Sequence, residues 1–239
     1  GTSYFSVFKK SVGEPSGAPY KNVSLDELAE IFKTEEKAKE IFKLPYGSDE
    51  YKQAKLNYKH YFTPSGIFSK RSNDSLKVFT KHCAFEADKQ DNPNTDPEKL
   101  RNDLIKDPRV VLCFKSFSGW PKWMVKLSGI APENFRDKYF EAVKYFNERY
   151  NIKCDHQHGK LSQPCYFSYD PDIYINHNAS PLILPSDEVK EEQTPGVLLK
   201  KAQINLNEAI PEPPTILHEG EEIFATKGNI STIIGKAKS

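Results

Sequence analysis

The sequence has no apolar run long enough to cross a bilayer, and it does not open with a basic segment followed by an apolar one. These two absences argue against a membrane-spanning helix and against a secretory leader. Cysteines are few, at positions 83, 113, 154 and 165, and they lack the spacing of a disulfide framework. We therefore expect a cytoplasmic protein whose thiols stay reduced.

A large excess of charge is also missing, because 34 Lys and Arg nearly balance 33 Asp and Glu, for a formal net charge of +1. The charges are unevenly placed: residues 1–186 carry 28 basic and 24 acidic side chains, whereas residues 187–222 carry 3 and 9. The mildly basic first part is compatible with nucleic acid binding but too weakly charged to argue for it alone. The hydrophobic fraction of 37% is that of a globular chain.

Local signals predict both helices and strands. Ser24 and Glu27 form a capping box before an amphipathic run, and we expect the helix that follows to break near Thr34. Asp96 followed by Pro97 predicts another helix start, and an apolar stripe predicts a third helix. The expected helices cover 25–42, 96–108 and 132–150, and the expected strands cover two short pieces of 57–69 and the ranges 77–88, 110–117, 123–127 and 165–170. This mixture predicts an α+β fold.

Composition divides the chain into three expected parts. Residues 1–184 hold the helix and strand signals and form the main domain. Residues 185–222 are acidic and contain five Pro, which predicts an extended linker with one short helix near 198–206. Residues 223–239 hold an apolar strand and then Gly235, as a phosphate loop begins, but the sequence ends before the Gly-Lys pair that completes such a loop. We therefore expect this last part not to bind ATP.

Two carboxylates, Glu86 and Asp88, lie two positions apart in the expected strand over 77–88. Strand residues two apart share a face, so these acids would project together while Phe85 points to the core. A divalent cation would turn their repulsion into shared coordination, and Asp155, after the third helix, is the candidate third ligand. Two metal ions held by such acids can clamp the attacking and leaving oxygens of a phosphoryl transfer.

Two Ser-Gly turns are candidates for holding a phosphate. Ser116, Ser118, Gly119 and Lys122 lie in one turn, where backbone amides and a point charge could face a triphosphate. A second turn, Ser65-Gly66, leads to Arg71. On these residues alone, an ordinary hairpin turn is the favoured interpretation of the first pattern, and a turn with surface charges also explains the second.

Simpler interpretations are also open for the acids and for a group of soft ligands. Glu86 and Asp88 could pair with Lys81 or Lys89 on a solvated strand face. A zinc site could use residue types such as Cys154, His156, His158 and Cys165, but this spacing is not a common finger pattern. Buried cysteines and satisfied or exposed histidines are the simpler interpretation of that group.

Taken in order, several segments resemble the VirE amino-terminal domain family of the primase-polymerase superfamily. They are SLDELAEIF, TPSGIFSKRSND, FEADKQ, SFSGWPKWMVKL, YFEAVKYFNERYNIKCD and CYFSYDPDIYINHNASPL. The resemblance covers about residues 4–182, and the final GNISTIIGKAKS resembles the start of the RepA-like helicase ATPase that commonly follows this family in bacterial mobile elements.

The resemblance implies a primase-polymerase core, in which an N-terminal α/β module packs on an RRM-like sheet with the active site between them. It implies that Glu86, Asp88 and Asp155 bind Mg²⁺ or Mn²⁺ and are catalytic. It further implies nucleotide binding by Ser116, Ser118, Gly119, Lys122 and Arg71. The expected partners are nucleoside triphosphates, a single-stranded DNA template and a helicase domain downstream in the same chain.

The sequence departs from that family at several of these positions. The first acid is Glu86 where Asp is frequent, Trp120-Pro121 interrupts the Ser-Gly turn, Lys122 stands where His is common, and Gln163 stands where relatives tend to carry Arg. These departures leave a second interpretation open. The domain would then bind single-stranded nucleic acid without catalysis and recruit the helicase.

Overall fold

The computed structural model describes residues 3–9, 17–155, 159–187, 215–219 and 222–226. It divides into one unit over residues 1–189 and another over residues 190–239. The helix expected near 198–206 and the phosphate-loop start expected at Gly235 lie outside the described residues. In the second unit the described backbone forms an antiparallel hairpin of β11 (Thr215–Glu219) and β12 (Glu222–Thr226), which spans the boundary expected between linker and final segment.

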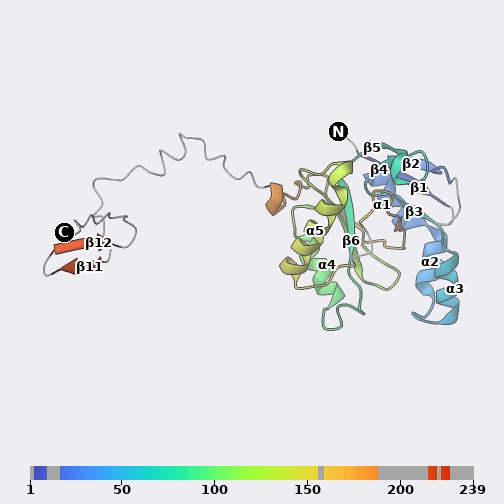
Figure 1. Cartoon of the computed structure of the whole chain (residues 1–239). Helices are drawn as coiled ribbons and strands as arrows, with labels where there is room; N and C mark the ends of the chain where they lie inside the picture. Colours follow the sequence, from blue (N-terminus) through green and yellow to red (C-terminus); the bar gives the residue numbers. More distant parts are fainter. Residues whose placement is uncertain (1–2, 10–16, 156–158, 188–214, 220–221, 227–239) are drawn as a thin grey trace. The chain divides into compact units, whose positions relative to one another are not determined.

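The first unit mixes helices with antiparallel sheets and is an α+β fold (Figure 1). Its N-terminal part contains a four-stranded sheet with the order β2-β1-β3-β9. The strands are β1 (Tyr4–Phe8), β2 (Lys21–Ser24), β3 (Tyr61–Phe62) and β9 (Cys165–Tyr166). Three helices connect β2 to β3: α1 (Leu25–Thr34), α2 (Glu36–Lys43) and α3 (Asp49–Asn57).

The capping signals place the helix starts correctly. The side chain of Ser24 accepts a hydrogen bond from the Glu27 amide, and the Glu27 carboxylate accepts one from the Ser24 amide. The expected break near Thr34 is confirmed, because Glu35 adopts an extended conformation and separates α1 from α2. Helix α3, whose N-cap is Ser48, was not expected.

A second four-stranded sheet has the order β10-β7-β8-β6 and carries two helices. Its elements are β6 (His82–Glu86), α4 (Pro97–Ile105), β7 (Val110–Lys115), β8 (Pro121–Lys126), α5 (Phe135–Tyr150) and β10 (Tyr174–Ile175). After α5, Cys154 forms an antiparallel bridge with Ala87 on the side of β6 opposite β8. The chain therefore runs in the order β6-α4-β7-β8-α5 and returns to β6 at this bridge.

The prediction of one strand over 77–88 is wrong in one respect, because this range forms two strands. β5 (Leu76–Phe79) pairs with β4 (Gly66–Phe68), whereas β6 pairs with β8. Lys81 separates them with a φ of 65°, a left-handed conformation that ends regular pairing. The strand expected over 165–170 is likewise reduced to β9, since that segment pairs with β3 at only two positions.

The core of the second sheet lies between its strands and helices α4 and α5, which Figure 1 shows on one side of β6. Phe85 stacks on Tyr139 at a centroid distance of 5.0 Å, and Phe146 lies 4.9 Å from Phe85. Trp123, across from Phe85 on β8, is fully buried in the same cluster. The opposite face of the sheet packs on the N-terminal part, where the rings of Phe32 and Phe114 are 4.2 Å apart.

A buried ion pair closes the end of this core near α5. The Asp107 carboxylate accepts hydrogen bonds from the Arg109 side chain at 2.6 and 2.7 Å and from the Tyr150 hydroxyl at 2.7 Å. Burial alone would raise the pKa of Asp107, but the hydrogen bonds from Arg109 and Tyr150 outweigh it, so the pKa is lowered. The folded protein therefore stabilises the ionised form of the Asp107 carboxylate relative to the protonated form.

We expect Asp107→Asn to lower the free energy of unfolding at pH 7 by about 2–3 kcal/mol, because it leaves buried donors without a charged acceptor. Because the pKa of Asp107 is lower in the folded than in the unfolded protein, its ionisation stabilises the fold above the unfolded pKa of about 4. This stabilisation is lost as the pH falls through the pKa of the folded state. The wild-type advantage over the variant should thus shrink below about pH 4. Urea unfolding at several pH values measures this, with the exposed Asp103→Asn as the control. An equal difference at pH 7 and pH 3 would contradict it.

Helices of the described residues are all too short or too polar to cross a membrane.

Candidate functional site

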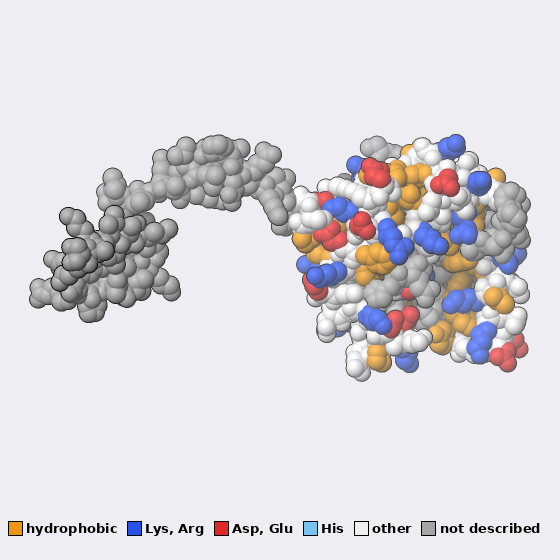
Figure 2. Space-filling view, viewed as in Figure 1, with side chains coloured by type: hydrophobic (Ala, Val, Ile, Leu, Met, Phe, Trp, Pro, Cys, Tyr) orange, Lys and Arg blue, Asp and Glu red, His pale blue; other side chains and the backbone are white. Residues whose placement is uncertain are grey.

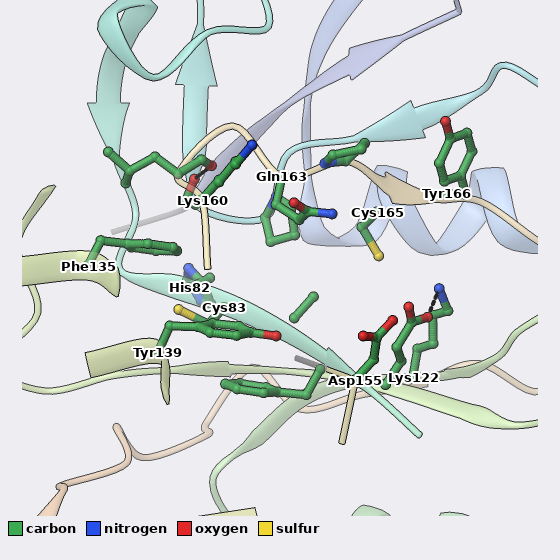
Figure 3. Close-up of a pocket in the computed structure, with 17 residues that line it drawn as sticks. His82, Cys83, Lys122, Phe135, Tyr139, Asp155, Lys160, Gln163, Cys165 and Tyr166 are labelled. Atoms are coloured by element: carbon green, nitrogen blue, oxygen red, sulfur yellow. Dashed lines mark hydrogen bonds and ion pairs between the residues drawn. The ribbon is translucent and has the colours of Figure 1, made fainter. Parts of the chain in front are cut away.

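The end of β6 brings a carboxylate pair together. Glu86 lies directly across from Lys122 of β8, and the bridge between Ala87 and Cys154 places Asp155 across from Glu86 on the other side. The Asp155 amide donates to the Glu86 carbonyl at 3.0 Å. Residues directly opposite in antiparallel strands share a face, so the side chains of Glu86, Lys122 and Asp155 gather on one face. Figure 3 shows Lys122 and Asp155 side by side at this place.

Lys122 forms an ion pair with Glu86 at the centre of this group. Burial favours the neutral amine, but the charges of Glu86 and Asp155 outweigh burial and raise the pKa of Lys122. The ammonium group thus stays protonated and partly neutralises the two carboxylates. A cation is held between acids at the position where the sequence predicted a metal ion.

Asp88 lies just past β6, and its placement differs from that of Glu86. It is exposed, and its carboxylate accepts a hydrogen bond from the Asp91 amide at 2.9 Å. The neighbouring Asn92 ties this turn to the segment before Asp155 by donating to the Lys153 carbonyl at 2.9 Å. The pair closest to Lys122 is therefore Glu86 and Asp155, with Asp88 beside it.

Within the described ranges, no group of three or more His, Cys, Asp or Glu side chains is arranged to hold a metal ion. Two members of the group considered for zinc, His156 and His158, lie outside the described residues. Its two cysteines, Cys154 and Cys165, are buried free thiols whose pKa values burial raises to about 12.

Two cavities meet at the ion pair, since Glu86, Lys122 and Tyr166 line both. The first, here called the inner pocket, has a volume of about 280 Å³. Its wall includes His82, Tyr139, Asp155, Lys160 and Gln163. The second, here called the basic pocket, has a volume of about 590 Å³. Its wall includes Lys52, Lys55, Tyr58, Asp88, Ser116 and Ser118.

The basic pocket collects three lysines from two elements, Lys52 and Lys55 from α3 and Lys122 from β8. Burial, followed by the repulsion from Lys122, lowers the pKa of Lys55, which shows that the two ammonium groups influence each other. An anion between them would relieve that repulsion. Ser116 and Ser118 add hydroxyl groups, whose oxygens are 2.8 Å apart.

The two remaining nucleotide-binding candidates occupy supporting positions. Gly119 has a φ of 81° and donates to the Ser116 carbonyl at 2.9 Å, so it shapes the turn between β7 and β8 and does not line either pocket. Arg71 lies between β4 and β5, also outside both linings, but its charge reaches Tyr166, whose pKa burial raises and Arg71 partly lowers again.

Sequence reasoning missed the two lysines of α3 as site residues. A signal for the helix exists: Ser48 precedes Asp49 and Glu50 in the first turn, and Lys55 lies in the last. Nothing local indicates that this helix lies beside Ser116 and Lys122, because the contact depends on how the N-terminal part packs on the second sheet.

Comparison with protein families finds a match to the model described as "BT4734-like, N-terminal domain" over residues 53–175. The matched range is just over half of the 239 residues and contains Glu86, Lys122 and Asp155. No curated protein and no solved structure matches the chain.

Proposed function

The chain belongs to the family of BT4734-like N-terminal domains, and we propose that its first unit catalyses metal-dependent nucleotidyl transfer on a single-stranded DNA template. The resemblance to VirE amino-terminal domains suggests the primase-polymerase chemistry, and a helicase domain downstream would be its partner. The proposal rests on one observation: Glu86 and Asp155 adjoin a pocket with three lysines.

The chemistry of the side chains fits Mg²⁺ or Mn²⁺. Both ions prefer hard oxygen ligands, and Mg²⁺ is commonly bound through one or two carboxylates, with water and substrate phosphates completing its shell. Glu86 and Asp155 would hold the ion, while Asp88 would stay outside its shell, since its carboxylate accepts a hydrogen bond from the Asp91 amide. When bound, the ion would stabilise the charge that develops on the reacting phosphate.

The residues of the chain would then divide the work of binding. Lys52 and Lys55 would attract the triphosphate into the basic pocket, and the Ser116 and Ser118 hydroxyls would donate hydrogen bonds to it. Lys122 would exchange its pairing with Glu86 for a phosphate oxygen. Positioning and charge stabilisation are the two contributions that phosphoryl transfer requires of a protein.

The test is incorporation of labelled nucleotide. The protein is incubated with single-stranded DNA, Mg²⁺ or Mn²⁺, and labelled ribo- or deoxynucleoside triphosphates, with and without a primer. Extended or newly made strands support the proposal. The absence of product with every metal, template and nucleotide, using protein whose fold circular dichroism confirms, rejects it.

A second function, binding of single-stranded nucleic acid without catalysis, is favoured by the ion pair of Lys122 with Glu86, which satisfies the acid without a metal ion. Lys and Arg side chains are also spread over the visible face of the first unit between hydrophobic patches (Figure 2). Such a module would bind single strands by backbone contacts and stacking, with strong salt dependence. Its binding would survive Glu86→Gln, and no product would form.

We expect Lys55→Gln to weaken binding of a nucleoside triphosphate by about tenfold, because it removes an ammonium group that lines the basic pocket. The control is Lys43→Gln, which removes the same charge from an exposed position on α2. Isothermal titration calorimetry with ATP and Mg²⁺ measures both. Equal affinities for the two variants would mean that α3 does not contact the phosphates.

A further inference from the structure

The inner pocket contains polar atoms that lack partners. Among the described residues, neither the Tyr139 hydroxyl nor Nδ1 of His82 has a hydrogen-bond partner, although both atoms are buried. The side chains are 1% and 5% exposed, respectively. Buried polar groups are nearly always paired, and those left unpaired call for an explanation such as a ligand.

Tyr139 is held rigidly with its hydroxyl toward the acids. Its ring stacks on Phe85 with an interplanar angle of 5° and lies 6.3 Å from the ring of Phe135. Figure 3 shows the hydroxyl pointing from α5 across the inner pocket toward the side of Asp155. A hydrogen-bonding group is therefore presented at a fixed position close to the carboxylate pair.

The phenol is neutral at any physiological pH. Burial raises the pKa of Tyr139, and the charges of Glu86 and Asp155 raise it further. A neutral phenol both donates and accepts hydrogen bonds, which makes it a suitable partner for another hydroxyl group. Unlike the lysines of the basic pocket, it carries no positive charge that would attract a phosphate.

The arrangement of the two pockets suggests one orientation for a bound nucleotide, with its phosphates in the basic pocket and its nucleoside in the inner pocket. If the phosphates of a nucleotide lay with the lysines of the basic pocket, the reacting phosphate would lie where the pockets meet at Glu86 and Lys122. The sugar would then enter the inner pocket beside Tyr139. The base then extends toward the opposite wall, where Figure 3 shows Lys160 and Gln163.

We propose that the inner pocket holds the nucleoside half of the substrate and that the Tyr139 hydroxyl binds the 2′-hydroxyl of its sugar. This inference rests on the proposed function and adds to it a preference for ribonucleoside over deoxyribonucleoside triphosphates. The preference comes from a buried hydroxyl that a ribose satisfies and a deoxyribose leaves without a partner.

The test measures the affinities of ATP and dATP for the full chain by calorimetry with Mg²⁺ and without template, so that no turnover occurs. Wild type should bind ATP about tenfold more tightly than dATP, which corresponds to one hydrogen bond made only by the ribose. Tyr139→Phe should remove this difference by weakening ATP while leaving dATP unchanged. Tyr145→Phe is the matched control, because this tyrosine of the same helix also has a buried, unpartnered hydroxyl but does not line the pocket.

Each result decides between the proposals. Equal wild-type affinities for ATP and dATP, or a Tyr139→Phe variant that weakens both equally, overturns the sugar contact and leaves nucleotide binding standing. Failure of wild type to bind either nucleotide overturns both the sugar contact and the proposed function. A loss of discrimination in Tyr145→Phe as well would point to a general change in α5 and also overturn the inference.

Discussion

Replacing Asp155 by Asn is expected to lower nucleotidyl transfer by at least about 100-fold, the scale on which loss of a group that stabilises transition-state charge is felt. The substitution keeps the size of the side chain and removes its negative charge. Since Asp155 is joined to Glu86 through its backbone amide, the strand bridge should remain. The loss would therefore come from weaker metal binding beside the reacting phosphate.

The matched control is Asp103→Asn, an identical change on the exposed surface of α4. It should retain full activity, and both variants should have the same urea midpoint of unfolding as wild type. Activity of Asp155→Asn within threefold of wild type would remove this residue from the catalytic group. Under the binding-only alternative, neither variant has activity to lose, and both should retain affinity for single-stranded DNA.

Phe146→Ala is expected to lower the free energy of unfolding by about 3–5 kcal/mol, the range for deleting a buried aromatic side chain. Phe146 is 1% exposed and lies between helix α5 and the second sheet. Its ring lies 4.9 Å from that of Phe85 and 5.4 Å from that of Trp123. Removing it would leave a cavity where α5 is attached to the strand that carries Glu86.

Phe42→Ala provides the comparison, because Phe42 also lies on a helix but is 42% exposed. We expect it to cost less than about 1 kcal/mol. Urea denaturation followed by circular dichroism measures both free energies. A difference below 1 kcal/mol between the two variants would show that the aromatic cluster is not the main support of α5.

Local sequence signals determined much of the helical structure. Ser24 and Asp96 both cap helices as expected, and Asn151 ends α5 in a left-handed conformation. Short strands were harder to predict, because β9 and β10 have two residues each and exist only through pairing with distant strands. Tertiary context decides such elements, and no periodicity can build up over so few positions.

Features of the site that depend on neighbouring residues in one strand could be predicted, whereas features that depend on contacts between distant segments could not. Alternation along one strand placed Phe85 in the core and Glu86 on the opposite face, as the structure has them. Asp155 could be named only as a candidate partner of Glu86, which the family resemblance then supported, because 68 intervening residues separate the two and no local spacing joins them. Lys55 and the unpartnered hydroxyl of Tyr139 depend on packing between elements, and side-chain spacing cannot indicate either.

Alternate residues of strand β6 point to the apolar core and to the candidate site. The number of residues in the strand therefore matters as much as their identity. Deleting or inserting a single residue between His82 and Phe85 would exchange the two faces, so that the Glu86 carboxylate would point into the apolar core and the Phe85 ring would point toward Lys122. Changes in chain length should therefore be rejected here during evolution. The turn between α2 and α3 carries no such constraint and should accept insertions freely.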